Sequence, residues 1–262
     1  VRAGKKTNES FDYIFICAGA ISTPNLLQKS KFKNRNIGKN LKLHPSIKIT
    51  AEFEELINFK NSGVAVHQVK EFSPKYSFGC SISSPPHLAV SLLDNGINAD
   101  YLEDKWPYMS TYYSMVTDGI GKVRTLPFLK EPIVTFKLGK VGLANIHEGL
   151  IKLGNLLFEA GATTVYPSIK GIRGIKSRDE WNALSLSIPQ NFYNLMTVHL
   201  MGTCKMSNSK TGVVDERGKT YESDRVFIAD SSIIPTALGV NPQGTIMGLA
   251  SLIADRFIEE IS

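Results

Sequence analysis

Short apolar segments separated by turn residues predict a chain that mixes parallel and antiparallel β-structure. Phe11–Ala20 is an apolar run that ends in small residues, which is typical of a buried parallel strand. Thr23 is a good helix N-cap and Pro24 suits a first helical turn, so a helix is expected to follow. A strand, a tight turn and a helix in this order predict a βα unit of the kind that packs against a nucleotide.

The middle of the chain, from about residue 46 to 193, has a different pattern. Apolar stretches between Pro, Gly and Asn turns predict strands at Ile47–Phe53, Lys75–Ser83, Thr111–Thr117, Lys122–Leu126 and Ile133–Leu138. An amphipathic helix is expected over Leu143–Phe158, with Gly161 as its stop. Strands in succession with few helices between them predict an antiparallel sheet that forms its own layer or domain.

The last quarter returns to the first pattern. Arg225–Asp230 predicts a second buried strand, and Pro242–Ile261 predicts a final helix with Asn241 as its N-cap. The unpaired amides of Gly244 and Thr245, together with the positive end of the helix dipole, would form an anion site. The simpler interpretation is a capped C-terminal helix without a ligand.

Composition changes this picture only slightly. With 262 residues, 42% hydrophobic and 21% charged, the chain has the profile of a globular protein with one or two domains. Its net charge of +6 comes from lysines scattered along the sequence. The simplest interpretation is that they lie on a solvated face. The sequence has no arginine-rich block with interleaved aromatics, so nucleic-acid binding is not predicted. The charge supports only a mild preference for anionic cofactors.

Cysteine usage and the chain start bear on the compartment. The three cysteines are far apart and never form a C-x-x-C pair, which argues against a disulfide framework and a zinc site. This usage favours a reducing, cytoplasmic compartment. No apolar run approaches the roughly 20 residues that span a bilayer, so no transmembrane segment is expected. The chain starts at Val1 without an initiator methionine, which suggests that it is cut from something longer.

His199 is the candidate for proton transfer. A histidine with a pKa near neutrality is a natural acceptor for an alcohol proton, although a lone histidine in an apolar stretch is more often a core or capping residue. Cys204 beside it could suggest a hydrolase. No acid or oxyanion motif completes such a triad, so Cys204 is predicted to be a buried small apolar residue.

Several short motifs in a fixed order resemble the glucose–methanol–choline (GMC) oxidoreductase family. The C-terminal ones are His199-Leu-Met-Gly-Thr-Cys-Lys-Met206, Gly212-Val-Val-Asp215, Val226-Phe-Ile-Ala-Asp230-Ser-Ser232 with Pro235-Thr236, and Gly239-Val-Asn241-Pro242 leading to Thr245. Upstream, Gly19-Ala-Ile-Ser-Thr-Pro24 and Ile37-Gly38-x-Asn40-Leu41 with His44-Pro45 are similar to further family segments. The motifs cover both ends of the chain, and the middle matches only loosely.

This resemblance implies an FAD-dependent enzyme that oxidises an alcohol to an aldehyde or ketone. His199 would be the base that takes the hydroxyl proton while the carbon-bound hydride passes to flavin N5, and Asn241 would hold the substrate oxygen. Residues expected to contact the cofactor are Ala18, Gly19, Asp230, Ser231, Pro242, Gln243, Gly244 and Thr245. The substrate would be a small-molecule alcohol, with a lean toward bulky apolar ones, and the electrons would pass to oxygen, a quinone or another acceptor.

The implied fold class is α/β (α+β). Residues 1–45 and 196–262 would form part of a Rossmann-like FAD-binding domain, and residues 46–195 an inserted, mainly antiparallel substrate domain with helices. The family's N-terminal G-x-G-x-x-G fingerprint is not found in this sequence. The chain is therefore expected to be the C-terminal portion of a longer enzyme, inactive alone. The alternative is a non-catalytic or incomplete flavoprotein subunit that needs a separate nucleotide-binding partner.

Overall fold

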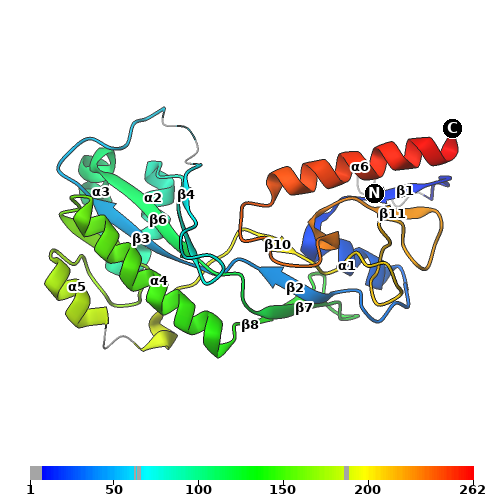
Figure 1. The fold of residues 1–262 in the computed structure, drawn as a ribbon, viewed down its shortest axis with the longest axis horizontal. Helices are drawn as coiled ribbons and strands as arrows, with labels where there is room; N and C mark the ends of the chain where they lie inside the picture. The colour runs from blue at the N-terminus through cyan, green and yellow to red at the C-terminus, as the bar shows by residue number, and fades with distance from the viewer. Residues whose placement is uncertain (1–7, 62, 64–65, 186–188) are drawn as a thin grey trace. The chain divides into compact units, whose positions relative to one another are not determined.

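The computed structural model describes residues 8–61, 63, 66–185 and 189–262, and it divides into two compact units (Figure 1). Unit 1 comprises Val1–Lys42, Ile120–Lys137 and His199–Ser262, and unit 2 comprises Leu43–Gly119 and Leu138–Val198. The chain therefore passes between the units several times. Residues 120–137 cluster with unit 1, whereas the boundaries expected from sequence place them in the insertion.

Unit 1 contains a two-stranded parallel sheet built from both ends of the chain. Strand β1 (Ile14–Ile16) pairs in parallel with β11 (Val226–Ile228). Helix α6 (Gln243–Ile261) packs on this sheet, with the ring of Phe257 5.0 Å from that of Phe15 and 5.2 Å from that of Phe227. A parallel strand followed by a helix confirms the predicted βα unit, with α1 (Gly19–Lys29) as the helix.

Helix α1 begins earlier than the sequence predicts. Its N-cap is Ala18, so Thr23 does not cap it and Pro24 lies inside it. Pro24 has no N–H to donate to the carbonyl of Ala20, one turn earlier. That carbonyl instead accepts a hydrogen bond of 2.7 Å from the hydroxyl of Thr203. A distant segment thus satisfies the acceptor that the proline leaves open, which local sequence rules cannot anticipate.

A four-stranded sheet completes the regular structure of unit 1. Its strand order is β10 (Leu200–Met201), β2 (Lys39–Leu43), β7 (Ile120–Arg124) and β8 (Ile133–Lys137). Strands β2, β7 and β8 run antiparallel to one another in that order. The short helix η4 (Ser231–Ile233) follows β11, and the core of the unit joins residues from α1, β11 and α6.

Unit 2 is built on a five-stranded antiparallel sheet, as the alternation of strands and turns predicts. Its order is β4 (Gln68–Val69), β5 (Ser77–Cys80), β6 (Met109–Met115), β3 (Ser46–Glu52) and β9 (Thr164–Pro167). Helix α4 (Lys140–Glu159) packs on one face through Ile146, Leu150 and Leu153, all buried. Helix α5 (Arg178–Ser185) packs against α4.

The opposite face of this sheet carries two helices that the sequence analysis does not predict. They are α2 (Pro85–Ser91) and α3 (Ala99–Lys105). The N-cap of α3 is Asn98, whose side chain accepts a 2.8 Å hydrogen bond from the amide of Tyr101. Buried Met109 and Tyr166 belong to their apolar cluster. In the strand register, Met109 pairs with Glu52 and Tyr166 pairs with Thr50. Both partners are next to Ala51, which belongs to the cluster under α4. Since successive side chains of a strand point to opposite faces, the α2–α3 cluster and the α4 cluster lie on opposite faces of the sheet.

Three further short helices complete the description. They are the 3₁₀ helices η1 (Leu93–Asn95), η2 (Trp106–Tyr108) and η3 (Gln190–Phe192). Across the described residues, no helix has the length and apolar character needed to cross a membrane.

Candidate functional site

Two segments that carry predicted site residues lie side by side in unit 1. The amide of Gly202 donates to the carbonyl of Ser231 at 3.2 Å, and the amide of Cys204 donates to that of Ser232 at 2.8 Å. Gly202 has a φ of +87°, and a Cβ there would lie 2.6 Å from the carbonyl oxygen of Asn40. Only glycine suits this close approach. The structure therefore joins the segment that begins at His199 to the segment that begins at Asp230.

Asp230 links the end of β11 to the start of α1. Its carboxylate accepts hydrogen bonds from the amide of Gly19 at 2.9 Å, the hydroxyl of Thr23 at 2.5 Å and the amide of Ser232 at 2.8 Å. The side chain is buried. Both carboxylate oxygens of Asp230 are thus hydrogen-bonded within the protein. The residue that the family resemblance implies beside the cofactor therefore has a structural role.

The start of α1 offers space rather than free donors. The amide of Ala18 donates to the hydroxyl of Thr23 at 3.2 Å, and the amide of Gly19 is bound by Asp230. Gly19 has a φ of +81°, and nothing lies within 4 Å of where its Cβ would be. A ligand can therefore approach this turn by contact, while these two amides hold the turn in shape.

The N-terminus of α6 presents unpaired donors. The first helical bond runs from the amide of Ile246 to the carbonyl of Pro242 at 2.9 Å, which leaves the amides of Gln243, Gly244 and Thr245 without helical acceptors. These three residues are exposed, and the first turn contains no acidic residue. Oxygen-rich or anionic groups fit this donor set and the helix dipole. Pro242, rather than the predicted Asn241, is the N-cap.

His199 and Cys204 have opposite chemical characters. His199 is partly buried immediately before β10, and this burial lowers the pKa of its imidazole, so the ring is neutral and able to accept a proton near pH 7. Cys204 is fully buried, as predicted, and desolvation raises the pKa of its thiol to about 12. A protonated, inaccessible thiol is a poor nucleophile, which argues against the hydrolase alternative.

Sequence reasoning missed two residues that hold the His199 segment in place. The side-chain amide of Asn40 donates to the carbonyl of Pro235 at 2.9 Å and to that of Gly202 at 3.3 Å. Thr203 is bound to α1 through Ala20. Both residues lie inside motifs quoted above, so the signal was present. Their partners, however, are about 160 to 195 positions away.

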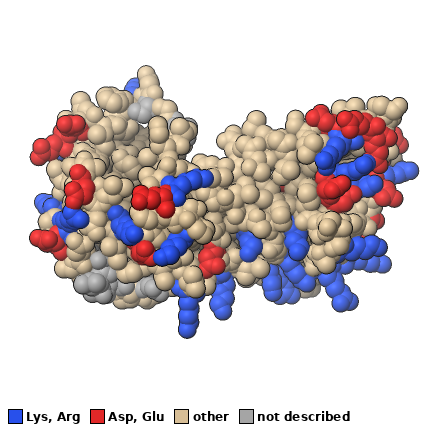
Figure 2. Space-filling model, in the orientation of Figure 1, with Lys and Arg blue, Asp and Glu red and all other residues tan. Residues whose placement is uncertain are grey.

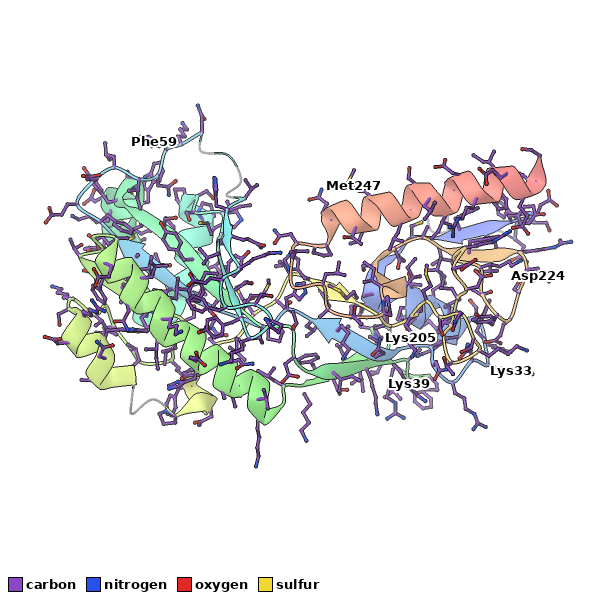
Figure 3. The ribbon with its side chains drawn as sticks, in the orientation of Figure 1. Lys33, Lys39, Phe59, Lys205, Asp224 and Met247 are labelled. Atoms are coloured by element: carbon purple, nitrogen blue, oxygen red, sulfur yellow. The ribbon has the colours of Figure 1, made fainter. Side chains whose placement is uncertain are left out.

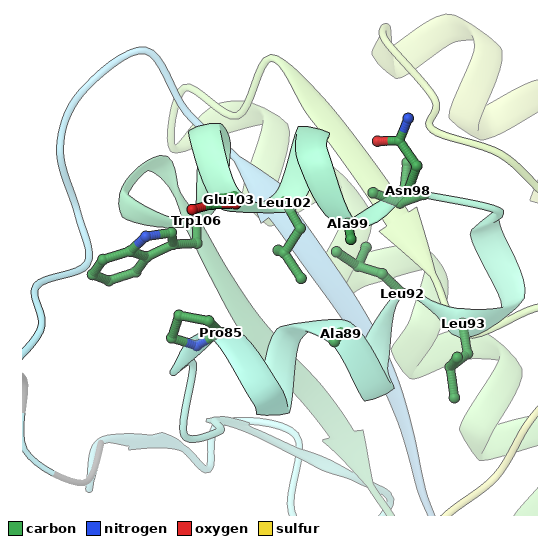
Figure 4. Close-up of a pocket in the computed structure, with 10 residues that line it drawn as sticks. Pro85, Ala89, Leu92, Leu93, Asn98, Ala99, Leu102, Glu103 and Trp106 are labelled. Atoms are coloured by element: carbon green, nitrogen blue, oxygen red, sulfur yellow. The ribbon is translucent and has the colours of Figure 1, made fainter.

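Unit 2 contains an apolar hollow of about 590 Å³ between α2 and α3 (Figure 4). Pro85 and Trp106 lie at one end and Leu93 at the other, with Ala89 and Leu102 between them. None of the predicted catalytic or cofactor-binding residues lines it. The sequence analysis missed this hollow because it did not predict the two helices that form it.

Comparison with protein families supports the interpretation of both chain ends. Residues 2–46 and residues 132–250 match two models described as GMC oxidoreductase, an N-terminal and a C-terminal one, which together span more than half of the chain. The description of the chain as the C-terminal portion alone needs a small correction, because residues 2–46 belong to the region that the N-terminal model describes.

Curated relatives agree with this match. An uncharacterised GMC-type oxidoreductase of Sinorhizobium fredii is 38% identical over 95% of this chain and 50% of its own length. A long-chain-alcohol oxidase of Arabidopsis thaliana is 30% identical over 97% of this chain and 36% of its own length. The chain thus spans half or less of the length of these relatives.

Solved structures show the same fold. A variant of the formate oxidase of Aspergillus oryzae RIB40, studied for FAD modification, superposes with a TM-score of 0.65 at 15% identity, over 95% of this chain and 54% of its own. Pyridoxine 4-oxidase from Mesorbium loti superposes with a TM-score of 0.60 at 18% identity, over 95% of this chain and 52% of its own. Motifs, fold and relatives agree, and the chain belongs to the GMC oxidoreductases, a family of enzymes whose cofactor is FAD.

Proposed function

We propose that the protein containing this chain oxidises an alcohol to an aldehyde or ketone with FAD as cofactor and His199 as base. The observation that carries the proposal is the state of His199. Its imidazole is partly buried and neutral, and it begins the segment that is hydrogen-bonded to the Asp230 segment. A neutral imidazole in a position fixed by surrounding structure is suited to general base catalysis.

The roles divide between the two segments and α6. His199 accepts the proton of the substrate hydroxyl, and Asn241 holds the oxygen of the same hydroxyl through its side-chain amide. Bound FAD supplies the acceptor, at N5, for the hydride that leaves the alcohol carbon. The free amides of Gln243, Gly244 and Thr245 stabilise negative charge at the positive end of α6.

The geometry at the start of α1 supports further cofactor contacts in this proposal. Ala18 and Gly19 provide a surface that a nucleotide can approach, because nothing lies within 4 Å of where a Cβ of Gly19 would be. Their amides are already bonded within the protein and hold the turn in shape. Asp230 acts mainly by holding Gly19 and Thr23 in place. Ser231 and Pro242 would complete the proposed cofactor contacts.

The substrate that we propose is a bulky apolar alcohol. Support comes from the relatives, several of which are long-chain-alcohol oxidases of Arabidopsis thaliana. Oxygen or a quinone would then take up the electrons.

The test is anaerobic bleaching of the flavin in the protein at its full natural length. Long-chain, sterol, polyol and choline-like alcohols are offered in turn, and we expect the oxidised flavin band to fade with a long-chain alcohol. In His199→Gln the rate of fading should fall roughly 10²- to 10⁴-fold, because general base catalysis contributes about this much. His67→Gln, at an exposed histidine of unit 2, is the matched control.

Each outcome has a defined meaning. A His199→Gln protein that keeps its flavin and bleaches at the native rate removes the assignment of the base. A yellow native protein that no alcohol bleaches refutes alcohol oxidation and leaves flavin binding in place. A colourless full-length protein favours the alternative of an incomplete subunit that needs a nucleotide-binding partner.

A further inference from the structure

Charge in unit 1 is strongly segregated. Residues 25–43 and 120–137 together contain ten Lys or Arg and a single acid, Glu131, whereas residues 199–262 contain six Lys or Arg and eight acids. Figure 2 shows a row of Lys and Arg side chains along the lower margin of this unit, where β2 and β7 lie in Figure 1. Lys33 and Lys39, labelled in Figure 3, lie along this margin. The scatter of lysines in the sequence therefore becomes one basic surface in the fold.

Specific hydrogen bonds bring the two basic segments together. The side-chain amide of Gln28 donates to the carbonyl of Val123 at 3.2 Å, and its oxygen accepts from the amide of Thr125 at 2.7 Å. The ammonium of Lys29 donates to the carbonyl of Lys130 at 2.8 Å. Helix α1 thus fixes both limbs of the β7–β8 hairpin, so the basic surface is a built feature of the fold.

The tip of this hairpin exposes apolar side chains. The amide of Leu129 donates to the carbonyl of Leu126 at 3.2 Å, which closes a turn with Pro127 and Phe128 at its centre. Proline at this turn position fixes the backbone, so the tip is a defined structure. Phe128 is 96% exposed, and the side chains of Leu126 and Leu129 beside it are also exposed.

A hollow with three cations lies next to the hairpin. Its volume is about 360 Å³, and Lys39, Lys122 and Arg124 are among its lining residues. In the described part of the chain, these three side chains take part in no ion pair with a carboxylate. Their charge is available for an external anion such as a phosphate group.

We propose that this surface docks on an anionic lipid membrane, with the Leu126–Leu129 turn inserted among the lipids and lipid phosphates in the cationic hollow. An exposed apolar tip surrounded by Lys and Arg matches the two attractions that hold a peripheral protein at a bilayer surface. Nucleic acid would use the same cations, but it offers no apolar layer for Phe128 and two leucines. The inference does not depend on the flavin chemistry, because it is tested by vesicle binding alone.

The test is co-sedimentation of the full-length protein with vesicles of phosphatidylcholine, with and without phosphatidylserine. We expect binding to the anionic vesicles only. Phe128→Ser should weaken binding about tenfold, because it removes the largest apolar contact. The triple variant Lys39→Gln, Lys122→Gln and Arg124→Gln should weaken it on the order of a hundredfold, since each cation near the surface is worth about fivefold.

The controls match the changes in kind and charge. Phe59→Ser removes an exposed phenylalanine of unit 2, and Lys60→Gln, Lys70→Gln and Lys176→Gln remove three exposed cations there. Both controls should bind as the native protein does. Equal binding to neutral vesicles, or native binding by either test variant, would overturn the proposal. Binding to heparin or single-stranded DNA that needs the cations, without vesicle binding that needs Phe128, would assign the surface to a soluble polyanion instead.

Discussion

Pro24 has consequences that reach the proposed active-site segment. As a proline inside α1 it leaves the carbonyl of Ala20 without its helical donor, and the hydroxyl of Thr203 supplies the missing hydrogen bond. Thr203 lies four residues after His199 in the same motif. A residue that looks like a helix-start signal in the sequence therefore anchors the segment that carries the proposed base.

Replacing Thr203 by Val should destabilise the protein by about 1–3 kcal/mol, because the isosteric change leaves the buried Ala20 carbonyl without a partner. Urea unfolding measures the change in the free energy of unfolding. Thr211→Val is the control, since Thr211 is exposed and its replacement should cost no more than about 0.5 kcal/mol. Equal effects at the two positions would show that the Thr203 hydroxyl is not needed by Ala20.

The pKa of His199 predicts a pH dependence. Burial lowers this pKa below its ordinary value of about 6.5, since the charged imidazolium is poorly solvated there. The second-order rate constant of anaerobic flavin reduction should therefore rise with pH, and the midpoint of the rise should lie below about pH 6.5. His199→Gln should lack this acid limb. An acid limb above that pH, or one that persists in the variant, would assign the titration to another group.

The same shift fixes the sign of a stability effect. Because the folded state holds the His199 proton less tightly than the unfolded state does, the unfolded state binds a proton first as the pH falls. The stability contribution of neutral His199 is complete above about pH 6.5 and is lost as the pH falls from there toward the folded pKa. As the pH falls, stability should thus begin to decline before the rate does, because the rate follows the lower folded pKa alone.

At the scale of elements, the sequence predicted the helices and strands whose own residues show a clear hydrophobic periodicity. Helix α4 has long apolar periodicity and the stop at Gly161, and it forms over Lys140–Glu159 as expected. Helices α2 and α3 have seven residues each, too few for a periodic pattern to stand out. The candidate site followed the same rule: His199 and Asn241 were proposed from motifs, while Asn40 and Thr203 act through distant partners.

Contact between α4 and α5 predicts opposite effects of one substitution in two helices. Gly154 of α4 faces the fully buried ring of Trp181 so closely that a Cβ would overlap the indole. Gly154→Ala should therefore destabilise unit 2 by about 1–3 kcal/mol, although alanine is the better helix former. Gly248 of α6 has nothing within 4 Å of a Cβ, so Gly248→Ala should stabilise by about 0.5–1 kcal/mol.

Urea unfolding of the two alanine variants provides the measurement. The intrinsic gain in helix propensity is the same at both sites, so the difference between them reports packing against Trp181 alone. Two stabilised variants would mean that α5 does not press on α4 as the structure has it.

At the scale of the whole molecule, the two units have separate cores. The apolar cluster that contains Ile16, Leu27 and Ile228 lies entirely in unit 1, and the clusters under α4 and under α2–α3 lie entirely in unit 2. The sequence-based boundaries differed from this division at the β7–β8 hairpin, which pairs with β2 and is hydrogen-bonded to Gln28 about 95 residues away. A linear pattern of strands carries no record of such pairing.

Because the cores are separate, loss of the cofactor is expected to lower the local stability of unit 1 more than that of unit 2. If FAD binds at the α1 turn and the N-terminus of α6, its removal takes contacts from unit 1 and leaves the core under α4 intact. Ligand binding stabilises the elements it contacts, and local stability is read by amide hydrogen exchange. In the full-length protein, amides of β1, α1 and the first turn of α6 should exchange faster in the apo form than in the FAD-bound form. Amides of α4 should keep their rate. Faster exchange in α4 by the same factor would mean that the cofactor stabilises both units together, and the assignment of the cofactor contacts to unit 1 would fail.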